Sequence, residues 1–80
     1  MHELGITEQM VNVALEQASR AGISKIKRIN LILGEMSGVS SESVQLYFDS
    51  LSKGTPAQGA ELCFQPDSGQ IFYIDSIEGE

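Results

Sequence analysis

Hydrophobic residues recur along this chain with two different periods, and the period changes three times. From residue 6 to residue 21 they follow the three- and four-residue spacing of one helix face. This predicts a helix that begins at Ile6 or Thr7, with Thr7 as its cap, and ends at Ala21 before Gly22. The predicted buried face consists of Ile6, Met10, Val13, Ala14, Ala18 and Ala21.

Residues 25–33 alternate instead, which predicts a strand with one apolar and one mixed face. Gly34 ends it, and a short loop follows. A second helix is predicted from Ser41 to Ser52, because its apolar residues again fall on one stripe. Ser40 or Ser41 can cap its start. The stripe is made of Val44, Tyr47, Phe48 and Leu51.

Two further strands complete the pattern, at residues 60–65 and 70–78. The residues between them, 66–69, have the chemistry of a turn, with proline to preset φ and glycine to accept a positive φ. The phase of the last strand is ambiguous: Phe72 and Ile74 point one way, but Tyr73 and Ile77 point the other.

The element order α-β-α-β-β predicts an α/β fold in a single small domain. The first two strands, joined by a helix, are expected to run parallel. The last two, joined by four residues, are expected to form an antiparallel hairpin. Two helices should then cover one face of a three-stranded mixed sheet.

Charge and composition narrow the possible functions. Eleven acidic against five basic residues give a net charge of −6, which argues against nucleic-acid binding and favours cations or a basic partner. No apolar run is long enough to span a membrane, and no secretory signal is visible. The only cysteine, Cys63, cannot form an internal disulfide and fits a reducing compartment, so we expect a cytoplasmic protein.

Catalysis is not expected. His2 is the only histidine, so no histidine remains for a Ser-His-Asp or Cys-His arrangement in the body of the chain. No glycine-rich phosphate loop occurs either. The sequence predicts a protein that is not an enzyme.

The most informative stretch chemically is Met1-His2-Glu3. The α-amine and the imidazole both lose protons near neutral pH, with reference pKa values of about 7.7–8.0 and 6.5. A metal ion held by these two nitrogens can also displace the protons of the His2 and Glu3 backbone amides. Four nitrogens in one plane suit Ni(II) or Cu(II). The alternative is that His2 is simply a solvated residue on a frayed terminus.

Glu3 has several possible roles. Its backbone amide could be a ligand, while its carboxylate could lie outside the plane or orient the imidazole. It could equally be only a favourable charge near a helix start.

Several segments of the chain resemble the HypA/HybF family of nickel metallochaperones. These segments are residues 1–7 (MHELGIT), 32–39 (ILGEMSGV), 53–55 (KGT), 59–62 (GAEL) and 72–78 (FYIDSIE). The resemblance covers nearly the whole chain. It implies a role in maturation of nickel–iron hydrogenase, or of urease, with Ni(II) bound by the N-terminal amine, the His2 imidazole and backbone amides. It also implies two partners, the nickel-linked GTPase HypB and the precursor of the hydrogenase large subunit.

One departure from the family is large. Its members carry a zinc-binding domain with two CxxC pairs between the last two strands, whereas this chain has only residues 66–69 there and Cys63 as its sole thiol. We therefore expect residues 1–80 to form the nickel-binding domain alone, without zinc. A truncated form in which a short turn replaces the zinc domain is favoured over a natural zinc-less variant. Such a short hinge also allows exchange of the last strand, so the chain should be a monomer or a strand-swapped dimer.

A different function remains open on the residues alone. A small α/β adaptor could use its acidic surface to dock a basic partner, with His2 incidental. The two hypotheses differ in whether binding depends on the free N-terminus.

Overall fold

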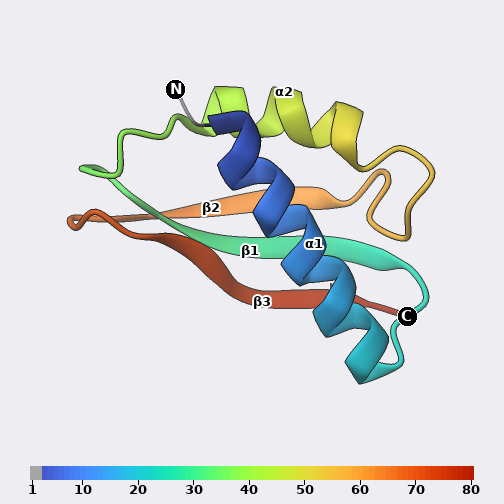
Figure 1. The fold of residues 1–80 in the computed structure, drawn as a ribbon. Helices are drawn as coiled ribbons and strands as arrows, with labels where there is room; N and C mark the ends of the chain where they lie inside the picture. Colours follow the sequence, from blue (N-terminus) through green and yellow to red (C-terminus); the bar gives the residue numbers. More distant parts are fainter. Residues whose placement is uncertain (1–2) are drawn as a thin grey trace.

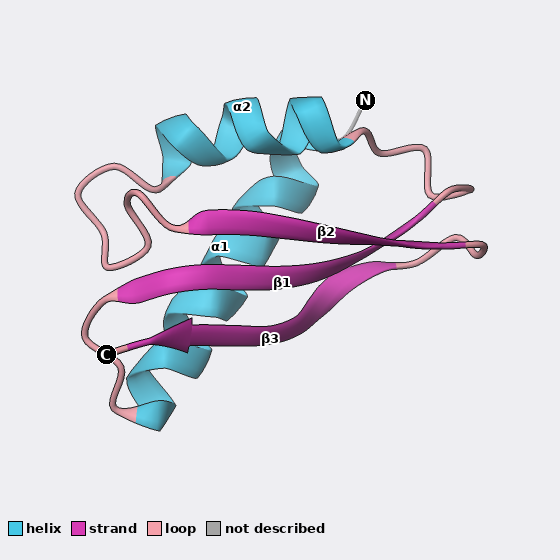
Figure 2. Cartoon of the chain, turned by 180° about the vertical axis from the view of Figure 1, so that it is seen from behind, coloured by secondary structure: helices cyan, strands magenta, loops and turns pink. Residues whose placement is uncertain are grey.

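A computed structural model describes residues 3–80 and confirms the predicted α/β class. The elements are α1 (Glu3–Ala21), β1 (Ile26–Gly34), α2 (Ser41–Leu51), β2 (Glu61–Asp67) and β3 (Phe72–Gly79). The helix α1 crosses one face of the sheet, and α2 lies beside the N-terminal half of α1 (Figure 1). Seen from behind, the strands lie in front of α1 and their other face is open (Figure 2).

The strand order is β2-β1-β3, so the most apolar strand lies in the centre. The strands β1 and β2 run parallel, as expected. The expected hairpin of the last two strands is wrong, because β3 pairs antiparallel with β1 and not with β2. A central position buries both edges of β1 at once. A β2–β3 hairpin would leave one edge of β1 without hydrogen-bond partners.

The connection between β2 and β3 makes this order possible by crossing the end of β1. The strand β2 continues through Pro66 and Asp67, so the turn lies later than predicted, at residues 68–71. Gly34 N–H donates to the Ile71 carbonyl at 2.6 Å, and Met36 N–H donates to the Gly69 carbonyl at 2.9 Å. Pro66 is tolerated within β2 because this strand lies at an edge of the sheet.

A β-bulge resolves the phase of β3. Leu31 pairs with Ile74 and the preceding residue, Asn30, pairs with Ser76, so Asp75 is an extra residue without a partner on β1. One extra residue reverses the alternation of side chains. Phe72, Ile74 and Ile77 therefore all pack against the core, although the sequence places them in two phases.

The helix α1 begins earlier than predicted and buries a slightly rotated face. Thr7 is fully buried inside the helix, and its hydroxyl donates to the Glu3 carbonyl at 2.6 Å, so it is not the cap. Val11 lies in the core, whereas Val13 is 43% exposed and Ala21 is exposed. Met10, Ala14 and Ala18 are buried as predicted. The prediction was wrong at Val13 and Ala21, and it missed Val11, because the buried face is rotated toward Thr7 and Val11.

The helix α2 agrees closely with its prediction. Ser40 is the N-cap, and its hydroxyl oxygen accepts from the Ser43 N–H at 3.1 Å. Val44 and Phe48 are completely buried. The buried core comes from α1, β1, α2 and the loop before β2, and comprises Met10, Val11, Ala14, Ala18, Ile26, Ile29, Leu31, Val44, Phe48, Ala57 and Ala60. The strands β2 and β3 add partly buried side chains around it.

Candidate metal centre

Of the three predicted metal ligands, only Glu3 is within the described residues. Met1 and His2 lie outside them. Glu3 is the first residue of α1 rather than part of a segment ahead of it. A chelate on this terminus would therefore be attached directly to the first helical turn.

The Glu3 carboxylate bridges the N-terminal ends of the two helices. Its Oε2 atom accepts a hydrogen bond from the Ser40 backbone N–H at 2.8 Å. Since Ser40 caps α2, this contact ties the start of α1 to the start of α2. One carboxylate oxygen is thus already used in holding the first turn in place.

The Glu3 backbone amide is suited to metal binding by its position. The first four N–H groups of a helix have no acceptor within that helix. The positive end of the helix dipole also favours an anionic group, such as a deprotonated amide. Ni(II) with two deprotonated amides, a neutral amine and a neutral imidazole has no net charge, so the dipole would not repel the complete site.

The loop after β1 links the first turn of α1 to the connection between β2 and β3. The loop runs from Gly34 to Ser40, and Ser40 holds Glu3. At its other end the Glu35 N–H donates to the Asp67 carbonyl at 2.7 Å. An unbroken series of hydrogen-bonded backbone segments therefore joins Glu3 to the connection at residues 68–71.

Residues 3–80 contain no group of three or more His, Cys, Asp or Glu side chains placed to hold an ion. Cys63 is half-buried on the open face of the sheet. Partial burial raises the pKa of the Cys63 thiol, and the nearby Glu61 carboxylate raises it further. Both effects disfavour the thiolate, which is the form that binds metals.

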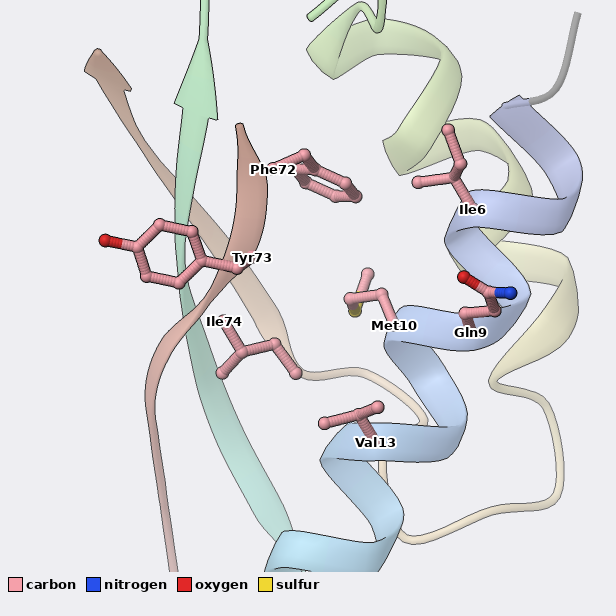
Figure 3. Close-up of a pocket in the computed structure, with 7 residues that line it drawn as sticks. All are labelled: Ile6, Gln9, Met10, Val13, Phe72, Tyr73 and Ile74. Carbon is pink, nitrogen blue, oxygen red and sulfur yellow. The ribbon is translucent and has the colours of Figure 1, made fainter. Parts of the chain in front are cut away.

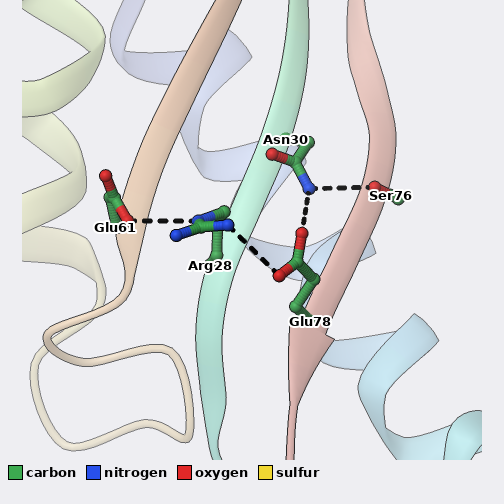
Figure 4. Close-up of polar contacts among 5 residues, drawn as sticks. All are labelled: Arg28, Asn30, Glu61, Ser76 and Glu78. Carbon is green, nitrogen blue, oxygen red and sulfur yellow. Dashed lines mark hydrogen bonds and ion pairs between the residues drawn. The ribbon is translucent and has the colours of Figure 1, made fainter.

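A polar network crosses the open face and links all three strands (Figure 4). Arg28 on β1 donates to Glu61 on β2 at 3.1 Å and to Glu78 on β3 at 3.3 Å. Asn30 donates to Glu78 at 2.9 Å and to Ser76 at 3.0 Å. These carboxylates raise the pKa of the Arg28 guanidinium, which stays charged throughout.

Sequence reasoning missed both the Glu3–Ser40 bond and the Arg28 network. Glu3 and Ser40 are 37 residues apart, and no local pattern connects them. The assignment of Ser40 as a helix cap was the only available signal, because the backbone N–H of a cap residue has no acceptor within its own helix and can donate to another side chain. Prediction of the Arg28 network would have required the strand order, because its residues lie on three different strands. The hydrophobic pattern does not determine that order.

No helix within residues 3–80 is long and apolar enough to cross a membrane.

Comparisons with known proteins agree on one family. The family model "Hydrogenase/urease nickel incorporation, metallochaperone, hypA" matches residues 1–76. A hydrogenase maturation factor HypA from Caldanaerobacter subterraneus is 42% identical over 65 residues, which are 81% of this chain and 57% of that protein. One from Dehalococcoides mccartyi strain 195 is 48% identical over 65 residues, 81% of this chain and 55% of that protein. The chain thus spans about half the length of these curated relatives.

The fold is also similar to a solved structure. The solution structure of the Ni metallochaperone HypA from Helicobacter pylori superposes with a TM-score of 0.76 at 17% identity, covering 95% of this chain and 72% of that one. This likeness supports the arrangement of two helices on a three-stranded mixed sheet. Together with the family match over residues 1–76, it leads to one conclusion: the chain belongs to the HypA family of nickel metallochaperones.

Proposed function

We propose that this chain binds one Ni(II) ion at its N-terminus and passes it on during maturation of nickel–iron hydrogenase, or of urease. The ligands in this proposal are the Met1 amine, the His2 imidazole and the backbone amides of His2 and Glu3. The observation that carries it is the position of Glu3, whose amide opens α1 while its carboxylate is held by Ser40. The family's association with nickel incorporation supports the choice of metal.

Binding and release in this site are controlled by protons. All four ligands must lose a proton before they coordinate, so the site assembles at neutral pH and dissolves on acidification. A recipient site that offers stronger ligands can remove the metal in steps, as each released amide regains its proton. The Glu3–Ser40 bond does not involve the proposed metal ligands and keeps Glu3 in place between cycles.

The wider role follows from family membership and is part of the same proposal. The chain acts in the cytoplasm as a carrier rather than an enzyme, receives or transfers nickel in contact with the GTPase HypB, and serves the precursor of the hydrogenase large subunit. It works without zinc, since Cys63 is its only thiol and burial keeps that thiol protonated.

A nickel titration of protein with a free Met1 tests the site. We expect one Ni(II) per chain and a visible absorption band of the square-planar type. Replacement of His2 by Ala, or acetylation of the Met1 amine, should abolish both without altering the circular dichroism spectrum. Cys63→Ser is the matched control, because it removes a soft ligand elsewhere and should leave the titration unchanged.

Two outcomes would overturn the proposal. Binding that survives His2→Ala would place the metal elsewhere. Absence of binding by protein whose mass shows an intact, free Met1 would favour the adaptor hypothesis instead.

A further inference from the structure

An apolar groove runs between α1 and the edge strand β3. Its volume is about 200 Å³. It is lined by Ile6, Gln9, Met10, Val13, Phe72, Tyr73 and Ile74. None of these residues is charged, and Val13 is 43% exposed at the rim.

The close-up of the groove shows how its two walls differ (Figure 3). Ile6, Met10 and Val13 extend from α1 toward β3, and Phe72 and Ile74 extend back toward the helix. The Tyr73 ring points the other way, toward the open face of the sheet. Tyr73 therefore contributes backbone to the groove and an aromatic ring, 49% exposed, to the opposite face.

The strand β3 can accept another strand along this wall. Within residues 3–80 it pairs with β1 on one side and with no strand on the other, so it forms one edge of the sheet. Every second residue of such an edge has a backbone N–H and C=O directed away from the sheet. The groove thus combines a free strand edge with a helix beside it, which is the arrangement in which an extended peptide adds to a sheet and inserts alternate side chains.

The chemistry on the two faces specifies the occupant. Side chains of an added strand that point to the helix would meet only the apolar lining and Gln9. Those that point to the open face would lie beside the Tyr73 ring. Asp75 adds a negative charge to the same face, where it lines a hollow over β1 and β2 with Asn30 and Cys63. An exposed aromatic face and a carboxylate both favour Lys or Arg, as does the net charge of −6.

We infer that the groove between α1 and β3 binds an extended segment of a partner protein in which apolar and basic residues alternate. The segment is short, because the bulge at Asp75 interrupts the edge and leaves residues 71–74 as its pairing partner. The groove reaches Ile6, one helical turn from Glu3. If the proposed nickel site is correct, a docked segment would lie close to the metal, but the docking surface does not depend on nickel.

The test uses metal-free protein and a synthetic peptide, acetyl-KVKVKVK-amide, followed by chemical shifts of backbone amides. We expect saturable binding with the largest shifts at residues 71–74 and along Ile6–Val13. A peptide with N-methylated valines should lose at least tenfold in affinity, because it cannot pair with the strand edge. The peptides EVEVEVE and KSKSKSK should also bind at least tenfold more weakly, since each lacks one of the two required chemistries.

Two variants that each add one lysine to an exposed apolar position test whether the peptide binds in this groove. Val13→Lys adds bulk and charge to the rim of the groove and should weaken binding at least tenfold. Leu46→Lys changes a still more exposed apolar residue, 68% exposed on α2, and should have no effect. Both positions are exposed, so both variants should fold.

Four results would overturn the inference: no saturable binding, equal binding of the N-methylated peptide, shifts centred on α2 and β2, or an effect of Leu46→Lys equal to that of Val13→Lys. A concentration-dependent dimer that buries residues 72–74 would assign the groove to a second copy of the chain and would equally overturn it. Each of these outcomes is independent of nickel binding, so failure here leaves the nickel proposal to its own test.

Discussion

Gly34 lies where the β2–β3 connection crosses the end of β1. A Cβ atom at this position would lie 2.8 Å from both the Gly69 carbonyl carbon and the Ile71 amide nitrogen. These are backbone atoms held by hydrogen bonds, so they cannot move aside independently. The glycine is required for close approach of two chain segments, not for an unusual φ.

Gly34→Ala should therefore lower the free energy of unfolding by about 1–3 kcal/mol, the usual range for overpacking. Urea denaturation followed by circular dichroism measures this. Gly5→Ala is the matched control, because none of the atoms of residues 3–80 that could obstruct a Cβ there lies within 4 Å of it. It should raise the stability by about 0.5 kcal/mol through helix propensity. Equal effects of the two substitutions would contradict the crossing geometry.

Cys63 offers a test of its protonation state. Its raised pKa means that the unfolded chain, with an ordinary thiol pKa of about 8.5, ionises first as the pH increases. At pH 8 iodoacetamide should therefore alkylate the folded protein several-fold more slowly than protein unfolded in urea. The stability contributed by the protonated thiol should be lost as the pH rises above about 8.5.

Glu61→Gln separates the causes of this shift. It removes the carboxylate that raises the pKa of Cys63 and leaves Arg28, which lowers it. The variant should react faster than the original protein, yet still more slowly than the unfolded chain, because burial is the largest cause. Reaction at the rate of unfolded protein would show that burial does not protect the thiol.

At the level of elements, one hydrogen bond joins the start of α1 to the start of α2, and a second one caps α2. Glu3→Ala removes the bond to the Ser40 N–H and should cost about 1 kcal/mol of stability. Glu3→Gln keeps an acceptor oxygen and should cost less. Ser40→Ala keeps that N–H but removes the cap of α2, which should also cost about 1 kcal/mol. Unfolding titrations of the single and double variants give the coupling between the two sites.

If the carboxylate positions the nickel terminus, Glu3→Ala should also weaken Ni(II) binding, and Ser40→Ala should not. The two substitutions cost similar stability, so a difference in nickel affinity would reflect positioning alone. Equal nickel affinities would limit the Glu3 side chain to a structural role.

Elements were predictable from sequence where periodicity was strong and capping residues were unambiguous, as in α2. The start of α1 was misplaced because Thr7 resembles a cap, while its hydroxyl actually bonds back to the Glu3 carbonyl inside the helix. The strand order was not predictable, because a four-residue connection fits a hairpin as well as a crossing over β1. In the sequence, the bulge at Asp75 showed only as an ambiguous alternation of apolar and polar residues in the last strand. Of the candidate ligands, the structure describes Glu3 alone, so the roles of Met1 and His2 rest on their chemistry.

At the level of the whole molecule, β3 is the last strand added to the sheet, and its contacts determine whether the chain is a monomer or a dimer. The strand β3 pairs with β1 along its length and also contacts α1. Exchange of β3 between two chains therefore requires both contacts, and the bonds of residues 69 and 71 to the loop after β1, to break first. We expect a monomer by light scattering at micromolar concentration, with a strand-swapped dimer forming only after refolding at high concentration. A dimer in freshly purified, never-unfolded protein would contradict this expectation.

The central place of β1 also has a consequence for biosynthesis. The strand leaves the ribosome early, but one of its two neighbours is almost the last part of these 80 residues to be made. At about 5–20 residues per second, roughly a second of translation separates the end of β2 from the end of β3. During that interval the nascent chain has an uncovered edge on β1 and an α1 that lacks Phe72, Ile74 and Ile77 against it. Slow codons within this stretch would prolong the exposure, and chaperones that recognise apolar segments would have their best opportunity to bind then.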